Sequence, residues 1–174
     1  MNVKFLNPFV EAAHEVLRIE TKFSLQRGEL SLEKNAYQTD DVTVIISLIG
    51  AVEGTVFYSM DHKTALNLAS TILTEELKTL DNLAQSGIAE LGNVITGRAS
   101  VKLADAGYEV TISPPALLLG SGGTISTLDF PRLTVPLIGE CGRIMIHLAL
   151  RENPNRSQKT PQIPVPPVPD LGKA

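Results

Sequence analysis

Four residues with reactive or small side chains recur at helical spacing near the middle of the chain: Ser86, Glu90, Asn93 and Gly97. At about 100° per residue of an α-helix, these positions fall within about 60° of one another. A hydroxyl, a carboxylate and an amide would therefore share one line on the helix surface, with a glycine at its end. A glycine inside a helix costs about 1 kcal/mol relative to alanine. Close approach by another protein explains such a residue.

The same four residues also suit an ordinary solvated face, because Glu and Asn three residues apart are common on helix surfaces. The complete pattern Ser-x3-Glu-x2-Asn-x3-Gly, together with the further glycines Gly87 and Gly92, favours a functional face.

An amphipathic helix over 77–104 is expected to position this line. Apolar residues spaced by three and four form its core-facing stripe: Leu80, Ala84, Ile88, Leu91 and Ile95. The polar line lies on the side opposite this stripe, so its side chains are expected to face solvent.

The pattern resembles the signature helix of the CheC/CheX/FliY family of chemotaxis phosphatases, whose core is Glu-x2-Asn. The resemblance covers roughly residues 1–150, from the opening Asn7-Pro8-Phe9-Val10 through a hairpin and the signature helix to Ser113-Pro114-Pro115 and Leu-Leu-Leu-Gly120. In the CheC-type members of this family the Glu-x2-Asn signature occurs twice. This chain has one, so it is closest to the CheX members.

This resemblance implies a phosphatase that acts on a phosphorylated CheY-type response regulator in chemotaxis. Asn93 would hold the attacking water in line with the phosphoryl group, and Glu90 would pair with the regulator's active-site lysine. Ser86 and Gly97 would flank the contact. The resemblance implies no cofactor of the chain's own, because the regulator supplies both the phosphoaspartate and its Mg²⁺. It also implies a homodimer.

The fold implied by the resemblance is a two-layer α/β domain of the α+β type, with a mainly antiparallel sheet and long helices packed on one side. Residue patterns predict a first helix capped by Asn7 with Pro8 at its first position, and a second helix capped by Asp61. Strands are expected over 41–50, 54–60, 108–113, 132–137 and 143–150, and a weak strand pair over 21–33.

The chain is predicted to divide into a phosphatase domain over 1–152 and a Pro-rich disordered tail over 153–174. The tail is expected to be a solubilising segment, although a Pro-rich run is also suited to docking on a partner.

Composition excludes several other classes of function. A net charge of −4 argues against nucleic acid or an anionic membrane as the main partner. A single cysteine, Cys141, permits no intrachain disulfide and is expected in the core. The opening residues lack an apolar signal region and no run is long enough to span a bilayer, so we expect a cytoplasmic protein.

Two other candidate sites are weak. The loop Gly120-Ser121-Gly122-Gly123 lacks the Lys of a phosphate-binding loop. The three histidines stand in separate elements without metal-ligand spacing, so no metal site is expected, and His147 is expected to be structural.

Two non-enzymatic functions remain open. The helix face would also serve a binding protein that sequesters a response regulator or joins a flagellar or receptor assembly. The second is that of a structural adaptor that binds its partner through the Pro-rich tail. Such an adaptor would keep its function when Glu90 is replaced and would lose it when the chain is truncated after Arg151.

Overall fold

β-Branched residues build the central hairpin of the sheet, which joins β4 (Val42–Gly50) to β5 (Val52–Met60) through Ala51. The computed structural model describes residues 3–34, 36–128 and 130–156. The remaining strands of the main sheet are β1 (Leu25–Arg27), β2 (Ser31–Glu33), β6 (Val110–Ile112), β7 (Ala116–Leu119), β9 (Arg132–Gly139) and β10 (Gly142–Glu152). The strand order is β1-β9-β10-β5-β4-β6, with β2 on β9 and β7 on β4, and every pairing is antiparallel.

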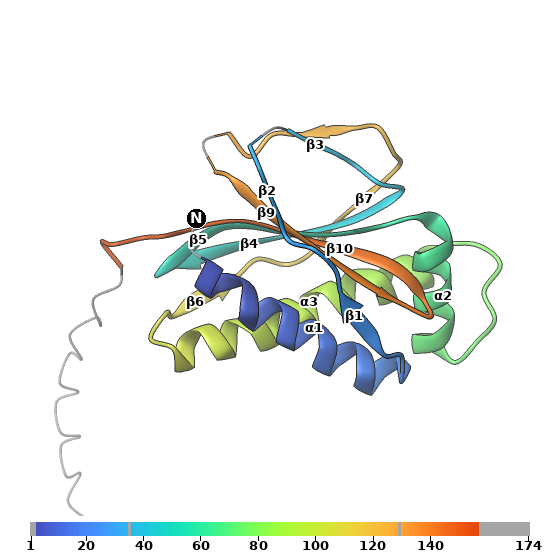
Figure 1. Cartoon of the computed structure of the whole chain (residues 1–174). Coiled ribbons are helices and arrows are strands. Elements are labelled where there is room, and N and C mark those ends of the chain that lie inside the picture. The colour runs from blue at the N-terminus through green and yellow to red at the C-terminus, as the bar shows by residue number, and fades with distance from the viewer. Residues whose placement is uncertain (1–2, 35, 129, 157–174) are drawn as a thin grey trace, which may run out of the picture.

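Three helices pack on one face of this sheet (Figure 1): α1 (Leu6–Thr21), α2 (His62–Leu73) and α3 (Asn82–Asp105). A 3₁₀ helix, η1 (Val3–Phe5), leads into α1. The arrangement confirms the predicted two-layer α+β fold. No helix in the described ranges has the combination of length and apolar character needed to cross a membrane.

The first and third helices begin at different residues from those predicted. Asn7 does not cap α1, because η1 runs directly into the helix and Leu6 is already helical and buried. Helix α3 begins at Asn82 rather than at residue 77, because the Asp81 carboxylate accepts a hydrogen bond from the Ala84 backbone N–H at 2.9 Å and caps it there. Asp61 caps α2 as predicted, accepting from the Thr64 backbone N–H at 2.7 Å.

The weak strand pair predicted over 21–33 is wrong in its pairing. Both strands form, as β1 and β2, but each pairs with β9 and neither with the other. Gly28 lies between them and its backbone N–H binds the Pro136 carbonyl at 2.8 Å. A short alternating run therefore predicted strands here without identifying their distant partner.

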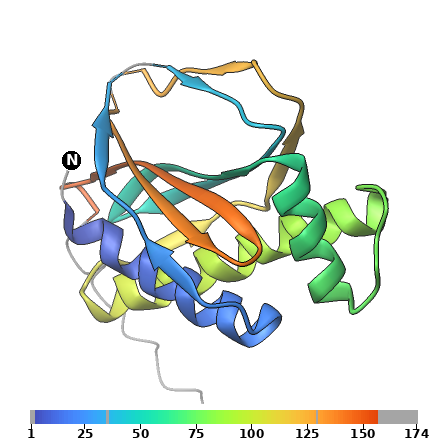
Figure 2. The same ribbon diagram turned by 45° about the vertical axis from the view of Figure 1, so that its right-hand side comes forward.

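A second, two-stranded sheet lies over the helix-free face of the main sheet (Figure 2). In it β3 (Tyr37–Gln38) pairs antiparallel with β8 (Thr124–Ile125), and we call these two strands and the loops that carry them the arch. The glycine-rich loop 120–123 belongs to this arch. Its backbone N–H groups donate to the Asp41 and Thr39 carbonyls at 2.8–3.0 Å and to the Thr39 hydroxyl at 2.9 Å. Three of the four backbone N–H groups of the loop are therefore used in hydrogen bonds within the arch and are not directed toward a bound phosphate.

The last described residues remain attached to the sheet just beyond the predicted domain boundary. The backbone N–H of Asn153 donates to the Ala51 carbonyl at 2.8 Å, and its side-chain amide donates to Glu53 Oε2 at 2.9 Å. Most of the predicted tail, residues 157–174, lies outside the described residues.

Helix α3 lies close to the sheet at Gly92, which is buried. A Cβ added there would lie 2.8 Å from Val44 Cγ1 and 3.3 Å from Tyr58 Cδ2, so a side chain would push the helix away. One turn further on, the Thr96 hydroxyl binds the Tyr58 hydroxyl at 2.8 Å, and both are buried. Burial also raises the pKa of the Tyr58 phenol, which therefore stays neutral. Together these contacts fix which side of α3 faces the sheet.

We expect Gly92→Ala to destabilise the protein by about 1–3 kcal/mol, the usual cost of overpacking a core. This holds although alanine is the better helix former. The matched control is Gly87→Ala, because a Cβ at Gly87 meets nothing within 4 Å. Urea unfolding of both variants measures the difference. Equal stability of the two variants would show that Gly92 does not set the distance between helix and sheet.

Candidate functional site

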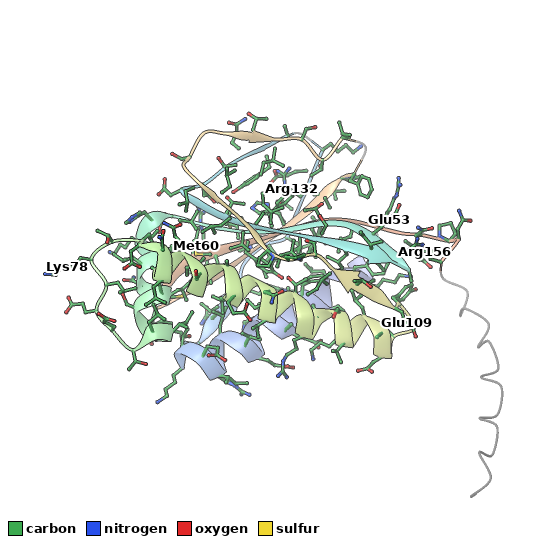
Figure 3. All side chains as sticks on the ribbon, turned by 180° about the vertical axis from the view of Figure 1, so that it is seen from behind. Glu53, Met60, Lys78, Glu109, Arg132 and Arg156 are labelled. Carbon is green, nitrogen blue, oxygen red and sulfur yellow. The ribbon has the colours of Figure 1, made fainter. Side chains whose placement is uncertain are left out.

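The buried stripe of α3 orients the candidate site. Four of the five predicted stripe residues lie in the helix and are at most 6% exposed: Ala84, Ile88, Leu91 and Ile95. Leu80 precedes the helix and packs against the core from the loop. Seen from behind, α3 runs below the sheet and in front of α1, with side chains projecting from it (Figure 3). The opposite side of the helix, which carries the predicted line, is therefore at the surface.

The structure brings two of the four predicted site residues into contact. The Asn93 side-chain N–H donates a hydrogen bond to Glu90 Oε2 at 3.3 Å. Glu90 is exposed and Asn93 is half-buried. The Ser86 hydroxyl instead donates to the Asn82 carbonyl of its own helix at 2.8 Å. The chemistry of this face is thus concentrated in a carboxylate–amide pair.

This pair keeps hydrogen-bonding capacity for an incoming molecule. Among the described residues, neither the Asn93 side-chain carbonyl nor the second Glu90 oxygen has a hydrogen-bond partner. An amide oxygen accepts hydrogen bonds, and a carboxylate accepts from cationic donors with additional strength. The pair can therefore bind a water molecule and a cation side by side.

Gly97 is the site glycine that the fold does not require. The nearest atom to a Cβ added there would be Ile112 Cδ1, at 4.0 Å, and its backbone is helical. The space over Gly97 is therefore open at the surface, one turn beyond Asn93.

Acidic residues of α1 hold the neighbouring part of α3 in place. Glu15 binds Lys102 at 2.8 Å and Arg98 at 3.2 Å, and Glu11 binds Lys102 at 3.2 Å. The hydrogen bond from Lys102 lowers the pKa of the Glu15 carboxyl. These acids therefore form ion pairs between α1 and α3. The spacing of four residues places Glu11 and Glu15 on one side of α1, and Arg98 and Lys102 on one side of α3, but it does not identify the partner helix.

His147 lies on the other side of the sheet and is structural, as predicted. Its ring nitrogens bind the Ser59 and Thr134 hydroxyls, both at 3.1 Å. Burial, followed by the positive charge of Arg132, lowers its pKa to about 3. In the described parts of the chain, no group of three or more His, Cys, Asp or Glu residues could hold a metal ion. Cys141 is buried, as predicted.

Comparison with known proteins gives consistent matches. The family model described as chemotaxis phosphatase CheX matches residues 42–137, which include α3. The CheY-P phosphatase CheX of Thermotoga maritima is 30% identical over 121 residues, or 69% of this chain and 78% of the relative.

Solved structures match over most of the chain. The CheX–CheY–BeF₃–Mg²⁺ complex from Borrelia burgdorferi is 30% identical with a TM-score of 0.74, covering 87% of this chain and 100% of that one. A CheC-like superfamily protein from Shewanella sp. PV-4 is 27% identical with a TM-score of 0.78, covering 87% of this chain and 99% of that one.

Proposed function

The chain belongs to the CheX family of chemotaxis phosphatases, and from this premise we propose that it accelerates hydrolysis of the aspartyl phosphate of a CheY-type response regulator. The observation that carries the proposal is the hydrogen-bonded pair of Glu90 and Asn93 on the open face of α3. The chemistry of hydrolysis needs only a water molecule in line with the phosphorus, because the regulator already carries the reactive acyl phosphate.

In this proposal Asn93 positions the attacking water. Its side-chain carbonyl accepts a hydrogen bond from the water, whose oxygen attacks phosphorus as the bond to the aspartate oxygen breaks. The products are inorganic phosphate and the free aspartate. Holding a reactant in line replaces a bimolecular encounter with an effectively unimolecular step, which is a large source of rate. Water-positioning amides serve the same purpose in other phosphoryl-transfer enzymes.

Mg²⁺ is assigned to the regulator's own active site. The Borrelia burgdorferi complex contains Mg²⁺ and BeF₃, a phosphoryl mimic, together with CheY. A divalent cation on the phosphoryl oxygens neutralises the charge that develops as the bond breaks. The phosphatase would then add only the water-positioning amide and the binding contacts.

Glu90 is proposed to pair with the lysine of the regulator's active site. Because Glu90 also accepts the hydrogen bond from Asn93, a lysine docked on its carboxylate would fix the amide beside the phosphoryl group. The open surface at Gly97 allows the partner's backbone to approach. Charge pairs of this kind set the orientation of a complex.

The test is a phosphate-release assay with purified, phosphorylated CheY-type regulators from the same host. Substoichiometric protein should release phosphate from at least one regulator over many turnovers. Binding to a phosphorylated regulator without faster release would contradict catalysis and favour sequestration, the main alternative.

We expect Glu90→Gln to weaken binding to the phosphorylated regulator by on the order of tenfold, between the values typical of exposed and buried charge pairs. The slope of affinity against salt concentration should also become shallower, because one charge pair is lost. Glu29→Gln, at an exposed glutamate on the loop between β1 and β2, is the matched control. An unchanged salt slope in Glu90→Gln would mean that Glu90 is only solvated.

A further inference from the structure

A cavity opens directly beside Glu90, at the junction of α1, α2 and α3. Its volume is about 220 Å³, and it is lined by Val16, Glu20, Ile72, Gly87, Glu90, Leu91 and Val94. A cavity of about 150 Å³ is enough to hold a benzene ring, so this one has room for a large apolar side chain. Glu90 therefore contributes both to the proposed catalytic face and to the wall of this cavity, which we call the Glu90 socket.

The chemical character of the socket is an apolar interior with an acidic rim. Val16 and Leu91 are buried and Ile72 is partly buried, whereas the side chains of Glu20 and Glu90 are exposed. An apolar centre surrounded by polar groups is the usual composition of a protein-binding patch. The rim charge favours an apolar group that is flanked by basic residues.

Exposed apolar side chains extend the socket along the same side of α3. Leu83 is 56% exposed, Val94 39% and Val101 60%. At about 100° per residue, all three lie within about 40° of Glu90 around the helix axis. The three side chains therefore form an apolar line on the side of α3 that carries Glu90, and Val94 also lines the socket.

We propose that the Glu90 socket receives an apolar side chain of the response regulator, next to the regulator's lysine. This inference rests on the proposed function, because that function places the regulator over Glu90. A protein whose lysine reaches Glu90 comes next to the mouth of the socket, since Glu90 forms part of its wall. An apolar side chain that enters the socket is removed from water and anchors the complex, as hot-spot residues do.

Filling the socket tests the proposal. In Gly87→Leu the new side chain would occupy the cavity, and the Cβ itself meets nothing within 4 Å. We expect KM for the phosphorylated regulator to rise at least tenfold and kcat to stay within about twofold, because the lost contact contributes equally to ground-state and transition-state binding. Gly87→Ala adds only a Cβ to the same wall and fills little of the socket, so its rise in KM should be much smaller than that of Gly87→Leu.

A second variant keeps the test decisive if Gly87→Leu unfolds. Glu20→Lys reverses the charge of the rim at an exposed position and should weaken regulator binding about fivefold or more. Glu29→Lys changes the net charge equally at the remote loop between β1 and β2, and should bind normally.

The outcomes separate the two proposals. If the wild-type protein accelerates hydrolysis but Gly87→Leu keeps its KM, or if Glu20→Lys and Glu29→Lys behave alike, the socket is not part of the interface. A fall in kcat at unchanged KM also contradicts anchoring. If the wild-type protein accelerates no regulator, the proposed function itself is wrong.

Discussion

Asn93→Ala is expected to reduce kcat for regulator dephosphorylation by about 100-fold or more, the usual effect of removing one transition-state contact. The Asn93 side chain is half-buried on the surface of α3. Among the described residues it forms a hydrogen bond to Glu90, on its own helix, so the fold does not depend on it. Binding should remain close to wild type, because Glu90 and the open surface at Gly97 are retained. Single-turnover phosphate release and a separate affinity measurement give the two values.

The control for Asn93→Ala is Asn82→Ala, at an exposed asparagine in the first turn of the same helix. Its main-chain carbonyl, which accepts the hydrogen bond from Ser86, is unchanged by the substitution. Near-normal acceleration by Asn93→Ala would refute its assignment as the water-positioning residue. Loss of binding in proportion to activity would instead favour sequestration.

Gly97→Leu is expected to abolish most activity in a protein that is as stable as wild type. Leucine is the better helix former by several tenths of a kcal/mol, and a Cβ at this position meets only Ile112 Cδ1, at 4.0 Å. Helical side chains lean toward the N-terminus, so the leucine would project over the turn that carries Asn93. A displacement of the docked regulator by about 1 Å is enough to reduce positioning catalysis by two orders of magnitude.

A melting curve and the phosphate-release assay together test this expectation. Gly97→Ala adds only a methyl group and should give a smaller loss of activity than the leucine variant. If Gly97→Leu is destabilised, Gly97 is a packing residue. If it is both stable and fully active, this face of α3 does not meet the substrate.

The candidate site was predictable because it lies on one helix, where sequence spacing alone fixes which residues share a side. The buried stripe of Ala84, Ile88, Leu91 and Ile95 and the surface position of Glu90 and Asn93 both follow from that periodicity. The β4–β5 hairpin was predictable for a similar local reason, since two β-branched runs are joined by a short connection.

Features that depend on distant segments were not predictable. The three helix glycines look alike in sequence, yet Gly92 faces Val44, Gly87 lines the Glu90 socket and Gly97 is open. What lies opposite a helical residue is decided by tertiary packing. For the same reason β1 and β2 were assigned to each other rather than to β9, which lies about a hundred residues further along the chain.

The division of α3 into two independent faces has a consequence for variation in this protein. The inward face, with Gly92 and Thr96, carries the contacts on which folding depends, whereas Glu90, Asn93 and Gly97 carry none of them. Partner preference can therefore diverge through a few surface exchanges at nearly constant stability. Under the proposed function, a library of variants sorted by expression level or heat resistance would retain inactive members, because such a selection does not detect loss of the Glu90–Asn93 pair.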